Sequence, residues 1–377
     1  MTPFSGLLFF YLLGLLLLPA VVLGLLEKPL KHYGLLFTVV MLAIVFGING
    51  QLHLLIVFYL WQAGLCLICS RLKSPSRALS ALAVLLSLLP LILIRLAVFF
   101  PSLGMFGLMG VSYMTFRALQ IILEARSGRL RRIPIFTLSY FLLFFPAVSS
   151  GPIDRYRRFE DDISAFLNQE EYLRLLRRGV FKLMWGAFFA LGLSTLLWNL
   201  WLSPLPDKGF LPAVSYMYGY TFYLFFNFSG YSSMAIGASY ILGVRLPENF
   251  NMPFLSLDIK DFWSRWHMSL SAFLRDYVYT RFVRSCLKNK RFKNPRTASY
   301  AGYFINMAIM GGWHGFTLRY LIYGLYHGLL VSANEALERG WKGFRPFRQK
   351  WWGQVIMALA TFHLVSLGLL IFSGRLI

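Results

Sequence analysis

The segment that decides the fold lies near the start of the chain, where residues 5–26 read SGLLFFYLLGLLLLPAVVLGLL. It contains no charged side chain, and it has the roughly 20 apolar residues that a helix needs to cross the hydrocarbon core of a bilayer. Backbone polar groups find no water there, so such a segment must be helical. A cleaved signal peptide has a basic start and a shorter apolar core. We therefore expect Ser5–Leu26 to be a retained transmembrane helix.

The same apolar character continues along the whole chain. Of its 377 residues, 58% are hydrophobic and 14% are charged, whereas soluble domains carry about 25% charged residues. These proportions predict an all-α, polytopic integral membrane bundle, with one domain over residues 1–377 and about eleven transmembrane helices. The candidate spans that follow the first one are Gly34–Asn49, Gln51–Cys69, Ala78–Phe100, Gly104–Glu124, Val180–Leu202, Leu211–Phe226, Tyr231–Leu242, Ala301–Gly312, Thr317–Ala333 and Gln354–Phe372.

Two segments do not fit a simple series of spans. Ile135–Ser149 is short for a crossing and ends in Ser-Ser-Gly-Pro, so we expect a re-entrant helix that surrounding protein shields from lipid. The polar stretch Asp154–Arg178 is followed closely by Val180, and Leu173, Leu176 and Val180 recur at helical spacing. This stretch is expected to form an amphipathic helix on the cytosolic face.

The net charge of +22 comes from 37 Lys and Arg residues against 15 Asp and Glu residues. In a soluble protein this excess would suggest nucleic acid, whereas in a membrane protein it reflects the enrichment of Lys and Arg in cytoplasmic loops. The connections around Gly50 and Pro101–Ser102 carry no charge. We therefore expect an extracytoplasmic N-terminus, cytosolic basic loops, contacts with membrane lipid and no nucleic-acid partner. The basic residues after the first, third and fifth spans are Lys28, Lys31, Arg71, Lys73, Arg77, Arg126, Arg129, Arg131 and Arg132.

Polar side chains at membrane depth are costly, so each of them is a candidate functional residue. The histidines are the candidates for catalysis. Among the six histidines, His267, His314 and His327 fall within one short stretch. His267 lies in DFWSRWHMSLS, residues 261–271, and His314 lies in GGWHG, residues 311–315. Glycine allows close approach of a substrate or another helix, and tryptophan excludes water. Along one continuous helix His327 would face away from His314.

The residues around these histidines exclude several kinds of site. Zinc sites use histidine or carboxylate pairs three or four residues apart, and none of the three histidines has such a partner in the sequence. No G-x-S-x-G segment of a serine hydrolase occurs. Cys66 and Cys69 lie in an apolar run, where we expect packing residues. We therefore expect no metal site.

What remains is a neutral imidazole acting as a general base on a hydroxyl, or a purely structural pair of histidines. A base within hydrogen-bond reach overcomes the weak nucleophilicity of a hydroxyl during attack on an ester or thioester. The alternative from another class is a transporter without covalent chemistry, in which Arg95 and Arg117 line a polar path. Inverted repeats would favour the transporter interpretation, and the sequence contains no internal repeat.

Four segments resemble the membrane-bound O-acyltransferase family, which carries an asparagine or histidine in a basic, aromatic loop and a catalytic histidine on a later apolar helix. His267 and His314 occupy these positions. The resemblance covers roughly residues 35–375 and is strongest to the D-alanyl transferases of the family. The matching segments are VSYMTFR at 111–117, SGPIDRYRRF at 150–159, DFWSRWHMS at 261–269 and NMAIMGGWH at 306–314.

The resemblance implies an acyltransferase whose catalytic residues are His314 and His267. It also implies a substrate channel beside the two histidines. The residues that we expect to line this channel are Trp263, Arg265, Trp266, Asn306 and Trp313.

The resemblance further implies that D-alanine arrives as a thioester on the 4′-phosphopantetheine arm of an acidic D-alanyl carrier protein. The chain itself is expected to bind no cofactor. The acceptor is expected to be teichoic acid or a similar polymer outside a bacterial cytoplasmic membrane. Residues 260–296 contain ten Lys and Arg residues against two acidic residues, a charge that would orient an acidic carrier. We expect Arg284, Lys288 and Arg291 to be docking residues.

The glycines beside the second histidine resemble another branch of the family. Gly311-Gly312 before Trp313 is similar to the glycine-rich version in alginate-type O-acetyltransferases. An exopolysaccharide O-acetyltransferase is therefore the alternative function, with the same reaction type and a different acyl group.

Overall fold

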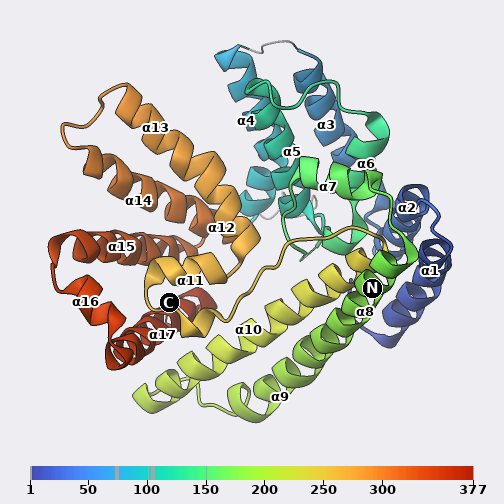
Figure 1. The fold of residues 1–377 in the computed structure, drawn as a ribbon. Helices are drawn as coiled ribbons and strands as arrows, with labels where there is room; N and C mark the ends of the chain where they lie inside the picture. The colour runs from blue at the N-terminus through green and yellow to red at the C-terminus, as the bar shows by residue number, and fades with distance from the viewer. Residues whose placement is uncertain (1, 73–75, 101, 103–106, 150, 377) are drawn as a thin grey trace. The chain divides into compact units, whose positions relative to one another are not determined.

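The fold is helical throughout, as the sequence predicts. Every regular element in the described residues is a helix, apart from one isolated bridge between Phe250 and Trp266 (Figure 1). The computed structural model describes residues 2–72, 76–100, 102, 107–149 and 151–376.

The chain forms two compact units. The first comprises Met1–Phe188 and Gly230–Pro247, and the second comprises Phe189–Ser229 and Glu248–Ile377. The helices whose residues lie in the first unit are α1 (Leu7–Leu25), α2 (Lys31–Ile48), α3 (Leu52–Arg71), α4 (Arg77–Leu96), α5 (Val111–Arg126), α6 (Ile135–Leu143), α7 (Tyr156–Ser164) and α8 (Gln169–Ala187).

The second unit contains the histidine-rich part of the chain. One helix, α10 (Phe210–Ile241), contributes residues to both units. The helices of the second unit are α9 (Ser194–Leu197), α11 (Ile259–Arg265), α12 (Met268–Leu274), α13 (Thr280–Lys288), α14 (Pro295–His314), α15 (Leu318–Gly340), α16 (Phe344–Gln349) and α17 (Trp351–Ser373).

Six helices in the described residues are long and apolar enough to cross a membrane. This finding agrees with the expected polytopic membrane protein. The start of the expected span Gly104–Glu124 lies outside the described residues, as do Lys73 and Ser150, and α5 begins at Val111. The six helices are α1, α2, α3, α4, α17 and the continuous helical stretch Gln169–Leu202.

The expectation of separate spans at Leu211–Phe226 and Tyr231–Leu242 is wrong, because the single helix α10 covers the first and continues through the second as far as Ile241. The Ser229-Gly230 pair between them does not mark a turn. A Cβ on Gly186 of α8 would lie 2.6 Å from the carbonyl oxygen of Gly230. Small residues let helix backbones approach closely in membranes, so Gly186 allows α8 to pack closely against α10 at Gly230.

The amphipathic helix expected over Asp154–Arg178 is not a single helix in the structure. The first part forms the separate helix α7, and the second part begins α8, which continues without a break to Leu202 through π-helical turns. Asn168 caps α8 by accepting a hydrogen bond from the Glu171 amide over 2.8 Å, which stabilises the helix start. The polar surface helix and the apolar span are therefore one element.

Ile135–Ser149 forms a short, broken and buried segment. It consists of α6 and a 3₁₀ turn, Phe145–Ala147. Arg117 of α5 is 1% exposed and donates hydrogen bonds to the backbone carbonyls at this break. Because the side chain is buried, its charge does not line the open polar path that the transporter alternative requires. The acceptors are the carbonyls of Phe141, Leu142, Phe144 and Ala147, at 3.0, 3.2, 3.5 and 2.8 Å.

Candidate active site

His267 lies in a strained backbone conformation directly before α12. Its φ of 44° and ψ of 51° are left-handed, which costs a non-glycine residue about 1–3 kcal/mol and persists only where surrounding structure holds it. The chain around Asn249 provides that hold. The Asn249 carbonyl accepts from the Met268 amide over 2.9 Å, and its side chain accepts from the Ser269 hydroxyl over 2.6 Å.

The imidazole of His267 is 3% exposed and lies between aromatic rings. The ring centroids of Phe228 and Trp313 lie 4.7 and 6.0 Å away. Neither ring nitrogen of His267 has a hydrogen-bond partner among the described residues. Burial lowers the pKa of His267, which lies outside the candidate spans, to about 3. So weak a base accepts protons poorly at pH 7, which favours a positioning role for His267.

His314 is the last residue of α14, where this helix packs closely on α15. A Cβ on Gly311 would collide with the backbone carbonyl of Tyr320 and would lie 3.2 Å from Cα of Gly324. A Cβ on Gly312 would meet only the Phe316 ring, at 3.6 Å. Gly311 is therefore a packing residue between the two helices, and this need explains the glycine without reference to the acyl group.

Aromatic rings surround His314 and connect it to His267. The centroid of the Trp313 ring lies 4.4 Å from that of His314 and 6.0 Å from that of His267. The Phe372, Tyr320 and Tyr323 rings lie 4.8, 5.8 and 6.4 Å from His314. The structure therefore brings the two predicted catalytic histidines into contact with one tryptophan.

His327 belongs to the same cluster, which the sequence interpretation missed. The spacing from His314 suggested opposite faces of one helix, but the chain breaks between α14 and α15, and Tyr323 contacts both imidazoles. His327 is fully buried, 5.1 Å from the Trp263 ring. A Cβ on Gly368 would lie 2.5 Å from its Nε2 atom. The described part of the chain groups no three His, Cys, Asp or Glu side chains as metal ligands.

A cavity of about 460 Å³ lies in the same unit, lined by residues of α11, α12, α14 and α15. Trp263 and Asn306 line it, as expected of channel residues. Both contribute a buried polar atom, the indole Nε1 and the amide Oδ1, that has no hydrogen-bond partner in the described chain. Arg265 and Trp266 are not among its lining residues, because Arg265 pairs with Asp261 at 2.7 Å and Trp266 stacks on Phe262.

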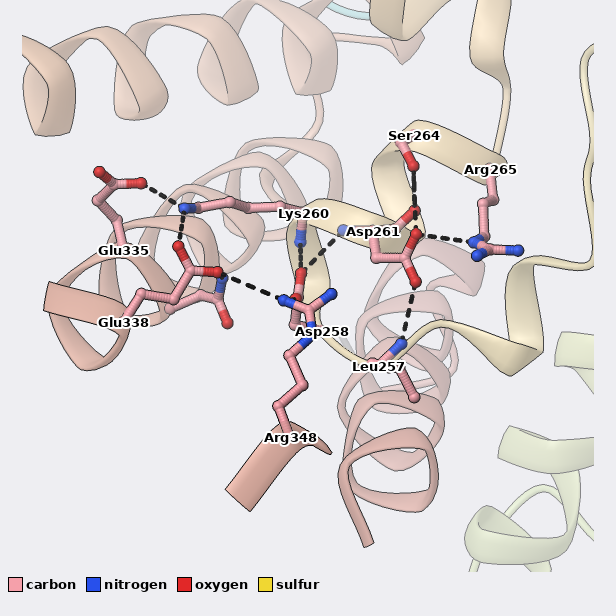
Figure 2. Close-up of polar contacts among 10 residues, drawn as sticks. Leu257, Asp258, Lys260, Asp261, Ser264, Arg265, Glu335, Glu338 and Arg348 are labelled. Carbon is pink, nitrogen blue, oxygen red and sulfur yellow. Dashed lines mark hydrogen bonds and ion pairs between the residues drawn. The ribbon is translucent and has the colours of Figure 1, made fainter. Parts of the chain in front are cut away.

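An ion-pair network holds the wall of this cavity in place (Figure 2). Lys260, a cavity-lining residue of α11, binds Glu335 and Glu338 of α15, the latter at 2.7 Å. Burial disfavours the charged ammonium, but the two carboxylates outweigh this effect and raise the pKa of Lys260. Asp258, which caps α11, binds Arg348 of α16 at 2.7 Å. These contacts fix α11, and with it Trp263, against α15.

The expected docking residues lie together on or just after α13. Arg284, Lys288 and Arg291 are all exposed, and none forms an ion pair within the described residues. The exposed side chains of Leu287 and Phe292 add apolar surface between them. A surface with both charge and apolar contacts suits a protein partner.

Comparison with known proteins finds relatives whose sequences are similar to this one over the whole chain. The chain is 41% identical to a teichoic acid D-alanyltransferase of Bacillus subtilis, covering 100% of this chain and 98% of the relative. It is 35% identical to a teichoic acid D-alanyltransferase of Streptococcus thermophilus, covering 99% and 95%. It is 32% identical to the probable alginate O-acetylase AlgI of Pseudomonas aeruginosa, covering 71% of this chain and 48% of the relative.

The sequence profile of the membrane-bound O-acyltransferase family matches residues 86–373. That range includes α5, the buried Arg117 and the whole histidine cluster. The match confirms the resemblance carried by the segments around His267 and His314. The chain therefore belongs to the membrane-bound O-acyltransferase family.

Proposed function

We propose that this acyltransferase moves D-alanine from a carrier-protein thioester, across the membrane, to teichoic acid or a related envelope polymer. The observation that carries the proposal is the similarity to the Bacillus subtilis D-alanyltransferase over the full length of both chains. The alginate O-acetylases match only 71% of this chain. Packing against α15 accounts for Gly311, one of the two glycines that resemble the alginate-type O-acetyltransferases.

The cavity beside Trp263 supports a donor on a phosphopantetheine arm. That arm contains amide groups, each with one hydrogen-bond donor and one acceptor. Trp263 Nε1 can donate to an amide carbonyl, and Asn306 Oδ1 can accept from an amide N–H, and both atoms are otherwise unpartnered in the described chain. A buried polar group without a partner costs about 1–3 kcal/mol, which a bound amide would recover. The cavity volume of about 460 Å³ lies within the usual range of small-molecule sites.

In the proposed mechanism His314 is the general base. It takes the proton of the acceptor hydroxyl as the oxygen attacks the thioester carbonyl carbon. The tetrahedral intermediate collapses, the C–S bond breaks, and the proton passes from His314 to the departing thiolate. Trp313 packs against the His314 imidazole with ring centroids 4.4 Å apart, and His267 contacts the same tryptophan at 6.0 Å, so the two residues hold the imidazole in place and exclude water.

The direct test uses membranes of a bacterium that lacks its own D-alanyl transferase and expresses this chain. Membranes receive carrier protein charged with radiolabelled D-alanine or, in parallel, with acetate. The proposal predicts label in the polymer fraction with the D-alanyl donor and little with the acetyl donor. Transfer of acetate in preference to D-alanine would contradict it.

We also propose about ten membrane crossings, with the N-terminus outside and both units forming one functional domain, since the family match runs through both. Counting α10 as one span in place of two changes the expected number from about eleven to about ten. It also brings residues 260–296 to the same side as the other basic loops, as the enrichment of Lys and Arg in cytosolic loops requires.

Reporter fusions test this topology. We expect fusions at Gly128 and Lys290 to report the cytosol and a fusion at Gly50 to report the outside, because only the first two lie in basic connections. Gly128 and Lys290 lie on opposite sides of α10 in the sequence. If Lys290 reports the outside while Gly128 reports the cytosol, then α10 does not act as a single crossing.

Charge reversal tests carrier docking on α13. The variant Arg284→Glu, Lys288→Glu, Arg291→Glu is expected to slow carrier association by about tenfold or more at low salt, because it reverses the local field that steers an acidic partner. The measurement is the association rate constant, by surface plasmon resonance on nanodisc-embedded protein, at low and high salt. For the wild type we expect a steep fall with salt.

A matched reversal separates a docking surface from overall charge. Arg71, Arg126 and Arg129 are also exposed and lie in other basic connections, and reversing them changes the net charge by the same amount. We expect this control to keep most of the wild-type association rate. Equal losses in both variants, or no salt dependence in the wild type, would show that α13 is not the docking surface.

A further inference from the structure

An acyl transfer needs more than the base at His314. When the acceptor oxygen attacks, the carbonyl oxygen of the acyl group takes the electron pair of the C=O double bond and becomes negatively charged. Preorganised hydrogen-bond donors aimed at this oxyanion supply a large part of the catalysis in such reactions. The need for such a donor rests on the proposed function, and the helix that follows His314 provides one.

Tyr320 lies in the first turn of α15, and its ring contacts both His314 and Phe372. The centroid of the Tyr320 ring lies 5.8 Å from that of His314 and 5.1 Å from that of Phe372. The phenol oxygen accepts a hydrogen bond from Nη2 of Arg319 over 3.3 Å. Within the described residues the Tyr320 hydroxyl donates its own proton to no recorded acceptor, so this donor is available to a substrate.

Arg319 is held in place by the end of α17. Its Nη1 donates to the carbonyl of Ser373 over 3.2 Å, and its guanidinium carbon lies 4.7 Å from the centroid of the Tyr320 ring. The next residue, Gly374, has a φ of 83°, and a Cβ there would lie 2.5 Å from Nη1 of Arg319. Glycine at this position therefore leaves the space that the guanidinium fills.

The charge of Arg319 has no carboxylate partner in the described chain. A hydrogen bond from a cation to the phenol oxygen draws electron density from it and strengthens the donation of the phenol proton. The pair thus combines a fixed cation, a polarised hydroxyl and the neighbouring imidazole of His314, all within the second unit.

We propose that Tyr320 is a catalytic hydrogen-bond donor to the acyl carbonyl oxygen, and that Arg319 is its positioning residue. The acceptor oxygen forms the new C–O bond while its proton passes to His314, and the carbonyl oxygen takes the electron pair against the Tyr320 hydroxyl. The pair then re-forms the C=O bond, the C–S bond breaks, and the thiolate receives the proton from His314. Tyr320 keeps its proton throughout.

The variant Tyr320→Phe removes only the hydroxyl and keeps the ring contacts with His314 and Phe372. We expect kcat for D-alanyl transfer to fall by about 10²–10³-fold, as for the loss of one oxyanion donor, with KM for the charged carrier unchanged. Tyr326→Phe is the matched control on the same helix, since the Tyr326 hydroxyl donates to the Leu364 carbonyl over 2.8 Å. The control is expected to keep the wild-type kcat.

Variants of Arg319 separate positioning from folding. Arg319→Met is expected to lose kcat, Arg319→Lys to recover part of it, and Arg319→Met combined with Tyr320→Phe to lose no more than Tyr320→Phe alone, because the arginine acts through the phenol. Additive losses, or a kcat for Tyr320→Phe within about threefold of wild type, overturn the inference. Wild-type protein that transfers no D-alanine would instead refute the proposed function, so the two failures are distinguishable.

Discussion

Replacement of His314 by alanine is expected to lower kcat for D-alanyl transfer by about 10²–10⁴-fold, the usual contribution of a general base. The side chain ends α14 and is packed among rings that remain in the variant, so the helix and its contact with α15 should persist. The measurement is label transfer from charged carrier in membranes, normalised to the amount of folded protein. Carrier binding should be unchanged, because the docking residues lie on and after α13.

His363→Ala is the matched control for this experiment. His363 lies on α17, is exposed, and contacts the Leu359 carbonyl through Nδ1 at 2.6 Å. It has no place in the proposed mechanism, and the variant should transfer D-alanine at the wild-type rate. A well-folded His314→Ala protein with wild-type turnover would exclude His314 as the base.

Replacement of Arg117 by methionine is expected to destabilise the protein by about 3–5 kcal/mol. The variant leaves the carbonyls of the broken segment after α6 without their donor, and it removes one of the two cations near the buried Asp154, which keeps its ion pair with Arg158. Lysine should recover only part of the loss, because one ammonium cannot reproduce the planar fork of donors of a guanidinium. The measurement is the melting temperature and the monodisperse yield in detergent.

Arg126→Met provides the control on the same helix. Arg126 is exposed in the last turn of α5, and surface substitutions of this kind change stability by about 0.5 kcal/mol or less. If Arg117→Met has the same melting temperature as Arg126→Met and the wild type, then the buried guanidinium does not hold the segment around Phe145–Ala147.

Local sequence was sufficient for the class of the protein and for naming two residues of the candidate site. The bilayer demands helices of a set length with few charges, and that demand acts on each segment separately, so apolar runs such as Ser5–Leu26 could be recognised one by one. The basic, aromatic segment around His267 and the glycine-flanked His314 were found in the same way. The structure places both histidines against Trp313.

What the sequence by itself determined about this protein is its all-helical membrane class and its family, and it also supplied the two histidines that we propose for the site. Only the tertiary structure decided that α10 is one helix, that His327 joins the cluster and that Arg319 reaches Tyr320 and Ser373. The physical reason is that a glycine gives the same local signal in a turn as at a close helix contact. Which of the two applies at Gly186 or Gly311 depends on the helix that packs against the glycine, and no local pattern names that partner.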